Sequence, residues 1–342
     1  MQLKTLCKYR SIWMGVAIVL VMLYHSEIEA PNMLLTMLVR RGYCGADIFV
    51  FASGLGMYFS YTRDHAPLAF MKRRLARLAP VYVPFIIGWG ICRALVRSFP
   101  INAMIGNLLG IQSLTGLGNG FNWYISALLI FYLLTPYLSE WIEKRDKPYA
   151  FLLFVGFLML VTAAFWESGS LILVARLPIF GVGMCFAKLS QDEKNRLTGG
   201  LALLLAASTI AGVCLLNACY TDYFQHLASY GLYWYPFILI VPGLCLFISV
   251  LAHAGQAFRV TRALFFLLQK LGDYSFEIFL THIFCFEICT SQRLAGIFPT
   301  GYAGTLLMML LVIPMSLLLH ACSVGCQRLA NRCTDLIKSR PR

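Results

Sequence analysis

A single histidine ends the first long apolar run of the chain. Residues 11–24 read SIWMGVAIVLVMLY, and His25 follows directly. Ionisable side chains within a membrane span are costly, which makes them candidates for function. A desolvated imidazole is neutral and can accept a proton from a hydroxyl group. The alternative is that His25 marks the depth at which a helix meets the lipid headgroups, and its position alone favours neither interpretation.

A carboxylate lies near the start of the second apolar segment. Asp47 belongs to GYCGADIFVFASGLG, residues 42–56, in which the glycines allow helices to approach closely. An unpaired carboxylate at this depth is expensive. We therefore expect Asp47 either to orient His25 across a helix pair or to pair with an arginine.

Three arginines stand just before the third apolar run. Residues 71–82 read MKRRLARLAPVY and place Arg73, Arg74 and Arg77 at helical spacing. Guanidinium groups bind phosphate oxygens in pairs, so this cluster suits phosphates. The alternative is a topology anchor that faces anionic lipid. The density of positive charge is higher than an anchor requires.

The composition places these residues in a membrane protein. The chain has 342 residues, of which 59% are hydrophobic and 13% charged, and its mean hydropathy is +0.73. Too few polar side chains are present to cover a soluble globule, and the apolar segments have the length of helical spans rather than of barrel strands. We predict an all-α, polytopic transmembrane helix bundle with about ten spans, forming a single integral-membrane domain over residues 1–342. The spans are expected near residues 11–30, 43–62, 78–97, 121–142, 149–167, 171–188, 199–219, 233–253, 273–291 and 302–325.

The positive charge follows the topology of such a bundle. The net charge of +13 is spread over short, alternate loops, which indicates membrane orientation rather than nucleic-acid binding. Both termini are then cytoplasmic. His25 lies about 22 Å along a helix from Arg10, and therefore near the outer boundary of the bilayer. Six arginines fall on or near the outer side, where topology does not account for them: Arg40, Arg41, Arg93, Arg97, Arg176 and Arg293.

Two outer segments can be interpreted in more than one way. Residues 98–122 are uncharged and rich in Gly and Asn, so they form either a re-entrant or capping segment over a cavity or a plain connecting loop. Residues 230–235, YGLYWY, are typical of an interfacial aromatic belt rather than of a platform for sugars.

No metal site is predicted. The twelve cysteines are scattered, mostly inside apolar runs, and form no CxxC pair. They are expected to act as small buried hydrophobic residues.

Six stretches of the chain match the motifs of a known family, in the same order. They are LVMLYHS, GADIFVFASGLGMYFS, MKRRLARLAPVYV, NWYISALLIFYLLTPYL, ARLPIFGVGM and LGDYSFEIFLTH. Through these stretches, which cover most of the chain, the sequence resembles the acyltransferase-3 membrane proteins, which acylate sugars and other envelope molecules.

The resemblance carries residues of the family onto this chain, with two departures. Many members have an arginine where Met14 stands here, and Arg10, one turn earlier, either replaces it or simply extends to the membrane interface. Many also have a histidine where Phe121 and Asn122 stand. The matching positions are His25, the cluster Arg73, Arg74 and Arg77, the pair Trp123 and Tyr124, the motif Arg176, Pro178, Phe180 and Gly183, and the late histidine His282.

The resemblance implies transfer of an acyl group, expected to be acetyl, from cytoplasmic acetyl-CoA to a hydroxyl of an extracytoplasmic carbohydrate or other envelope molecule. His25 would act as a general base or carry the acyl group itself, and Arg176 or Arg40 would stabilise the developing oxyanion. The expected location is a bacterial inner or plasma membrane. In this hypothesis the catalytic residues are His25, Asp47 and Arg176, acetyl-CoA is held by Arg10, Arg73, Arg74 and Arg77, and the acceptor is bound by Arg40, Trp123, Tyr124 and His282.

A secondary transporter of a small polar or anionic solute is the competing interpretation. Transporters typically show paired halves with broken helices at matching positions, and this sequence shows none. A glycerolipid acyltransferase of the HxxxxD type is not favoured, because Ala30 and Glu287 stand five residues after His25 and His282. Glu277 and Glu287 are expected to form a polar stripe on the helix of His282, and no special role is expected for His65, His226, His253 or His320.

Overall fold

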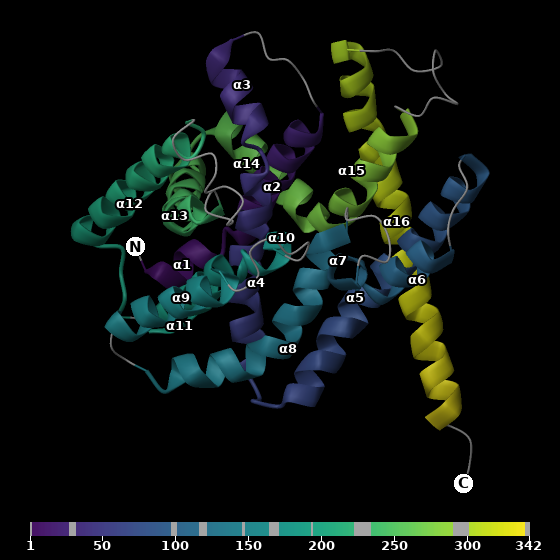
Figure 1. Cartoon of the computed structure of the whole chain (residues 1–342), viewed down its shortest axis with the longest axis horizontal. Helices are drawn as coiled ribbons and strands as arrows, with labels where there is room; N and C mark the ends of the chain where they lie inside the picture. Colours follow the sequence, from purple (N-terminus) through teal and green to yellow (C-terminus); the bar gives the residue numbers. More distant parts are fainter. Residues whose placement is uncertain are drawn as a thin grey trace.

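The computed structural model of the chain describes residues 2–26, 32–96, 101–115, 122–145, 148–163, 171–192, 194–221, 234–289 and 301–338. Throughout these ranges the secondary structure is helical and contains no strand, which confirms the all-α prediction (Figure 1). Arg97, Phe121, His226 and Arg293 lie outside the described residues, and the side chain of Glu287 is not among those described.

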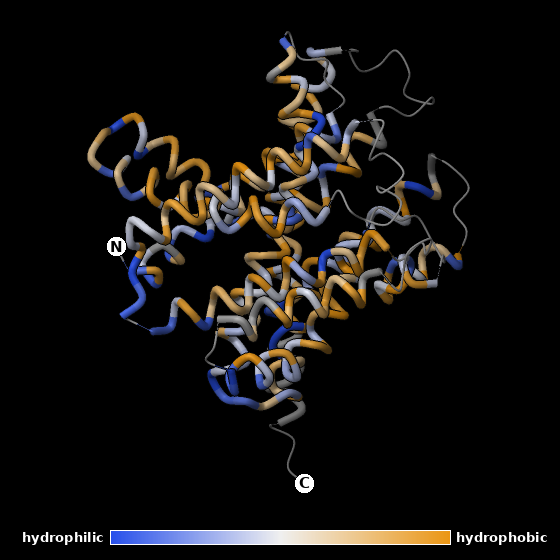
Figure 2. Tube along the Cα trace, turned by 60° about the vertical axis from the view of Figure 1, so that its left-hand side comes forward, coloured by the Kyte–Doolittle hydropathy of each residue, from blue (hydrophilic) through white to orange (hydrophobic). Residues whose placement is uncertain are grey.

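Six helical segments are long and apolar enough to cross a membrane, counted over the described residues. Hydrophobic residues occupy most of their length in Figure 2. The segments confirm six of the ten predicted spans, and the chain is an integral membrane protein. They are Pro67–Ala94 in α5 (Pro67–Val96), Trp123–Glu143 (α8), Leu171–Gln191 across α10 (Leu171–Val174) and α11 (Leu177–Gln191), Gly199–Ala218 (α12), Pro236–Gly255 (α13) and Tyr302–Leu329 in α16 (Gly301–Lys338).

The other four predicted spans also contain helices, but these do not reach span length or hydropathy, so a count of ten is not confirmed. The described parts of three are short, with 15 or 16 residues each: α2 (Arg10–His25), α9 (Pro148–Ala163) and α15 (Ser275–Cys289). At a rise of 1.5 Å per residue, 16 residues cover about 24 Å. The fourth, α4 (Cys44–Tyr61), has 18 residues, and its glycines, tyrosines and Asp47 make it less apolar.

Helix α4 lies in the middle of the molecule, with α12 towards one edge and α16 towards the other (Figure 1). It packs closely on α11 because one glycine of each helix faces the backbone of the other helix. A Cβ atom on Gly54 would collide with the carbonyl oxygen of Phe180, and one on Gly183 would collide with that of Phe51. This contact fixes α11, and with it the residues just before that helix, against α4.

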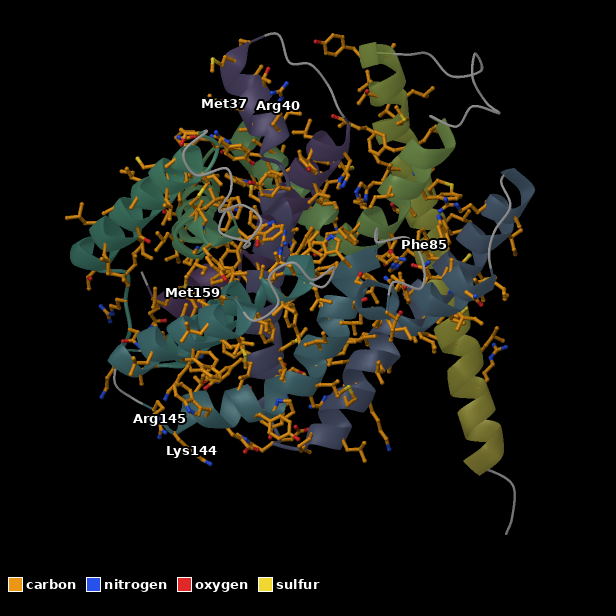
Figure 3. The ribbon with its side chains drawn as sticks, viewed as in Figure 1. Met37, Arg40, Phe85, Lys144, Arg145 and Met159 are labelled. Atoms are coloured by element: carbon orange, nitrogen blue, oxygen red, sulfur yellow. The ribbon has the colours of Figure 1, made fainter. Side chains whose placement is uncertain are left out.

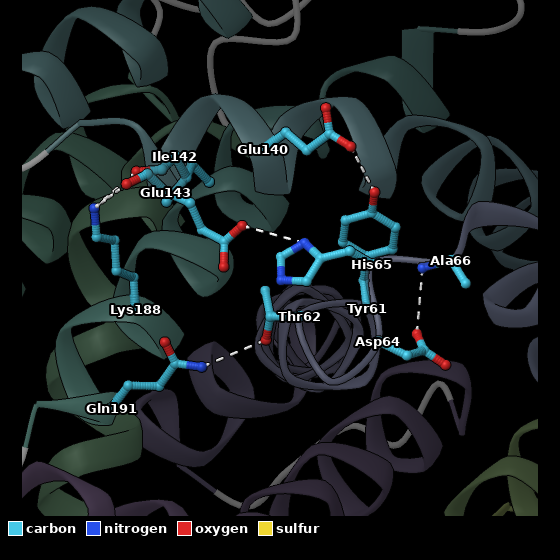
Figure 4. Close-up of polar contacts among 10 residues, drawn as sticks. All are labelled: Tyr61, Thr62, Asp64, His65, Ala66, Glu140, Ile142, Glu143, Lys188 and Gln191. Carbon is cyan, nitrogen blue, oxygen red and sulfur yellow. Dashed lines mark hydrogen bonds and ion pairs between the residues drawn. The ribbon is translucent and has the colours of Figure 1, made fainter.

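The ends of α4, α8 and α11 are joined by polar contacts (Figure 4). The last carbonyls of a helix have no partner within it, and a lysine is favourable there. Lys188 of α11 fills this role for α8, since its Nζ donates to the carbonyl oxygens of Ile142 at 2.9 Å and Glu143 at 3.1 Å. The Tyr61 hydroxyl of α4 donates to Glu140 at 2.7 Å.

The segment at residues 98–122 is not a plain loop in its described part. Two short helices, α6 (Ile101–Leu109) and α7 (Gln112–Thr115), pack on α5 and α8. The Tyr82 hydroxyl of α5 donates to the carbonyl oxygen of Asn107, and Asn122 Nδ2 donates to Asn107 Oδ1 at 3.3 Å. The described part of this segment is therefore helical and packed on the bundle.

Three further helices complete the described fold. Helix α1 (Leu3–Cys7) contacts α11 and α13, and α3 (Met33–Arg40) follows α2. Helix α14 (Arg259–Asp273) connects α13 to α15 and packs along α2.

His320, for which the sequence indicates no special role, makes a polar contact between two helices. Its Nδ1 lies 2.8 Å from Glu277 Oε1, so the pair joins α16 to α15. The sequence could not indicate this contact, because the two residues are 43 positions apart. The contact gives Glu277 of α15 a partner on another helix.

Candidate functional site

His25 and His282 come together from the two ends of the chain. His25 closes α2, His282 lies in α15, and His282 Nε2 is 3.3 Å from His25 Nδ1. The ring centroids are 5.1 Å apart. His282 is completely buried, whereas His25 lines a pocket.

Backbone carbonyls determine which nitrogen of each ring carries a proton. His282 Nδ1 lies 3.2 Å from the carbonyl oxygen of Ile278, and His25 Nδ1 lies 3.0 Å from that of Val21. A carbonyl oxygen only accepts, so in both neutral rings the proton is on Nδ1. His282 Nε2 then accepts from the Nδ1–H group of His25. This tautomer places the lone pair of His25 on Nε2, the nitrogen that a general base uses.

Asp47 pairs with an arginine and does not orient His25. Asp47 Oδ1 lies 3.6 Å from Nε of Arg176, and the two residues are 0% and 3% exposed. Arg176 immediately precedes α11, and its Nη1 donates to the carbonyl oxygen of Ile172 at 2.7 Å. The Arg176 guanidinium carbon also lies 4.6 Å from the ring centre of Trp123 and 4.5 Å from that of Trp234. Arg176 is thus held between two indole rings.

His25 and Arg176 line a pocket of about 740 Å³, a volume typical of sites for small molecules. Figure 3 shows Arg40 on α3, and Lys144 and Arg145 at the opposite end of the molecule. Four residues of the predicted site line the pocket, namely His25, Arg40, Trp123 and Arg176. Its lining is Val21, Tyr24, His25, Arg40, Tyr43, Ala46, Trp123, Ile172, Arg176, Tyr220, Trp234, Phe279 and Ile283.

Tyr124 lies behind the pocket rather than in its lining. Its hydroxyl is 3.1 Å from Ser53 Oγ, and its ring centre is 5.2 Å from that of Phe279. Phe279 in turn lies 5.6 Å from the ring centre of His282. Tyr124 and His282 are therefore neighbours of the pocket through Phe279.

Arginines gather at the other end of α2. Arg74 Nη2 donates to the carbonyl oxygen of Gly56 at 2.6 Å, and a Cβ atom on Gly56 would collide with Nη1 of Arg10. Arg77 is within electrostatic range of both arginines, and Tyr124 is within range of Arg10. Gly56 thus allows Arg10 and Arg74 to meet on α4. We call Arg10, Arg74 and Arg77 the arginine cluster.

Arg73 has a different environment from the arginine cluster. Its two terminal nitrogens donate to Asp64 at 2.5 and 3.1 Å, and Nη2 also donates to the carbonyl oxygen of Ser60 at 3.1 Å. The Arg73 guanidinium lowers the pKa of the Asp64 carboxyl in the turn after α4. Arg73 therefore joins the start of α5 to the end of α4.

Sequence reasoning missed several residues of the pocket wall. Trp234 belongs to the aromatic stretch that we interpreted as an interfacial belt, yet it stacks on Arg176. Tyr43 and Tyr220 also line the pocket, and their hydroxyl oxygens are 2.8 Å apart. The density of aromatic residues was the available signal, but it does not distinguish a ring that faces lipid from one that faces a cavity.

No group of three metal-ligating side chains occurs among the residues that the structure describes. The site is thus built from imidazole, guanidinium and aromatic groups inside a bundle of apolar helices. That combination defines an integral membrane protein with an ionisable site in an open pocket between its helices.

Comparison with known families identifies the class. The family model described as an acyltransferase domain, of the acyltransferase-3 type, matches residues 14–321, nearly the whole chain. The chain belongs to this family and is a membrane acyltransferase. No curated protein and no solved structure matches it.

Proposed function

We propose that the protein transfers an acetyl group from cytoplasmic acetyl-CoA to a hydroxyl of an extracytoplasmic carbohydrate or envelope molecule, with residues 1–342 acting as one domain. The main support for this proposal is the position of two groups of side chains at the two ends of α2. The helix has the arginine cluster at its start and the histidine pair at its end. Arg10 and His25 are the first and last of the 16 residues of α2, and about 22 Å of helix separates them.

The arginine cluster fits the phosphates of a coenzyme A donor. Arg10 and Arg74 converge on a glycine that leaves room for both, and Arg77 adds a third positive charge nearby. Guanidinium groups bind phosphate oxygens in pairs, which favours a polyanionic ligand at this end. When bound, acetyl-CoA supplies the thioester whose acyl carbon accepts the oxygen of the acceptor.

Aromatic side chains connect the two ends of the proposed site. Tyr124 is within electrostatic range of Arg10, and its ring contacts Phe279, which contacts His282. These packed rings mark the direction from the arginine cluster to the histidine pair, along which we propose that the pantetheine arm extends.

His25 is the proposed general base. Its Nε2 takes the proton of the acceptor hydroxyl and returns it to the departing thiolate, so the ring ends the reaction neutral. His282 accepts from Nδ1–H of His25 and so favours the tautomer that this step needs. Arg176 lines the same pocket and is assigned to the developing negative charge on the acyl oxygen, with Asp47 holding it in place.

The orientation follows from the charges at the two ends. Arg40 and the pair Lys144 and Arg145 lie at opposite ends of the molecule (Figure 3). By the positive-inside rule, the loop after α8 faces the cytoplasm. We propose that both termini are cytoplasmic, that the membrane is a bacterial inner or plasma membrane, and that the pocket opens to the outer side.

Sealed vesicles test this proposal. The purified protein is reconstituted, saccharide acceptors are enclosed, and radiolabelled acetyl-CoA is supplied outside to molecules whose arginine cluster faces outwards. We expect labelled acetyl esters on enclosed saccharide, identified by mass spectrometry. Label that stays outside, together with uptake of a solute, would instead support a transporter.

A further inference from the structure

The described lining of the pocket that contains His25 is positively charged. Arg40 and Arg176 are both in its lining, and none of the described lining residues is an aspartate or glutamate. Asp47 lies behind the lining, where it pairs with Arg176 at 3.6 Å. The pair is neutral overall, so the net positive charge of the pocket comes from Arg40.

Arg40 differs from its neighbour in the chain. Arg41 lies over the ring of Tyr220, with 5.1 Å between its guanidinium carbon and the ring centre, and it is not part of the pocket lining. Arg40 ends α3 and lines the pocket that contains His25. Arg40 therefore lines the pocket itself, whereas Arg41 contacts the pocket only through Tyr220, a residue of its wall.

The remaining wall suits a saccharide. The rings of Tyr24, Tyr43, Trp123 and Trp234 line the pocket and combine flat apolar faces with O–H or N–H groups at their edges. Sugar rings likewise have apolar C–H faces and polar edges. A volume of about 740 Å³ accommodates a small oligosaccharide rather than a large polymer segment.

We infer that the acceptor is an acidic saccharide whose carboxylate or phosphate is bound by Arg40 while a hydroxyl faces Nε2 of His25. This inference rests on the proposed function for the identity of the reaction, but not for the binding itself. An arginine recognises either anion through paired hydrogen bonds, and these are stronger than bonds between neutral groups. Neutral saccharides would use the aromatic wall alone.

Binding without acyl transfer tests the inference. The full-length protein, in nanodiscs of zwitterionic lipid and without acetyl-CoA, is titrated with methyl glucuronide, glucose 6-phosphate and methyl glucoside. Trp123 and Trp234 in the pocket provide the fluorescence signal. We expect the acidic probes to bind about tenfold more tightly than the neutral one, with the stronger of the two identifying the anion.

Matched variants assign the effect to one side chain. Arg40→Gln should reduce the affinity for the acidic probes to that for methyl glucoside, whereas Arg41→Gln should leave it unchanged. Arg40→Lys should retain part of the preference, because a lysine keeps the charge but not the paired geometry.

The inference is overturned if charged and neutral probes bind equally to the unaltered protein, or if neither binds. It is also overturned if Arg41→Gln has the same effect as Arg40→Gln, which would indicate contact with lipid headgroups. Since no step uses acetyl-CoA, failure of acetyl transfer in vesicles would reject the proposed function and leave this result standing.

Discussion

His282 Nε2 accepts a hydrogen bond from Nδ1 of His25 across 3.3 Å, although the two residues are 257 positions apart. One ring is completely buried, and the other lines the pocket. The buried ring therefore acts on the reaction through the exposed one. His282 is a positioning residue in this account, and its effect should appear in turnover rather than in binding.

Replacing His282 tests the positioning role. His282→Leu removes one of the two acceptors of the Nδ1–H group of His25 and leaves the carbonyl oxygen of Val21 as the other, so kcat should fall by roughly tenfold with the KM for acetyl-CoA unchanged. His282→Gln, whose amide oxygen can accept the same bond, should recover part of the loss. Steady-state kinetics of both variants provide the measurement. A rise in KM at constant kcat would assign His282 to binding instead.

The arginine cluster and Arg73 should differ in their effects on donor binding and on thermal stability. Arg74→Ala combined with Arg77→Ala should weaken binding of acetyl-CoA at the cytoplasmic side by at least tenfold, because charge-assisted hydrogen bonds are lost. Arg73→Ala should leave the donor affinity unchanged and lower thermal stability slightly. Radioligand binding and thermal melting distinguish these outcomes. Weaker donor binding in Arg73→Ala alone would contradict the division between the two groups.

Gly56 should be required by the donor site although it bears no side chain. The methyl group of Gly56→Ala would lie too close to Arg10 Nη1, so that guanidinium would have to shift. We expect the Kd for acetyl-CoA to rise about tenfold, the loss of one charge-assisted contact. Gly88→Ala is the control, because a Cβ atom there meets no atom within 4 Å. Equal affinities in the two variants would show that Arg10 does not contribute.

The pair formed by Asp64 and Arg73 predicts a pH dependence of stability. Arg73 lowers the pKa of Asp64 in the folded state, so the stabilisation is fully present above the unfolded pKa of about 3.9. It is lost as the pH falls through the lower, folded value. The difference in melting temperature between the unaltered protein and Asp64→Asn should therefore be constant from pH 8 to about 5 and shrink below about pH 4. A difference that shrinks between pH 8 and 6 would contradict this assignment.

Much of the fold could be predicted because apolar length and basic loops are local features of the sequence. His25 and the basic segment around Arg74 could be found for the same reason. The residues that His25 and the arginines contact could not be predicted. Arg73 and Arg74 are adjacent, yet one binds Asp64 and the other the backbone of Gly56, a difference set by which way each side chain faces on α5.

The remaining contacts of the site join residues that are far apart in the sequence. The sequence left two partners open for Asp47, and packing of α4 against α11 selects Arg176. Trp234 was assigned to the membrane interface because its neighbours are aromatic, whereas the fold brings it onto Arg176. Helix length was the other difficulty, since the described parts of α2, α9 and α15 are shorter than the spans that their apolar sequences predict.

The central claim is that His25 performs the chemistry at the far end of α2 from the arginine cluster. The most direct measurement is acetyl transfer to saccharide by reconstituted His25→Ala, with His65→Ala as the control because His65 lies in the turn after α4. Both variants must insert at the level of the unaltered protein. We expect His25→Ala to bind acetyl-CoA normally but to form no acetyl ester, and His65→Ala to retain activity. Unchanged ester formation by His25→Ala would contradict the central claim.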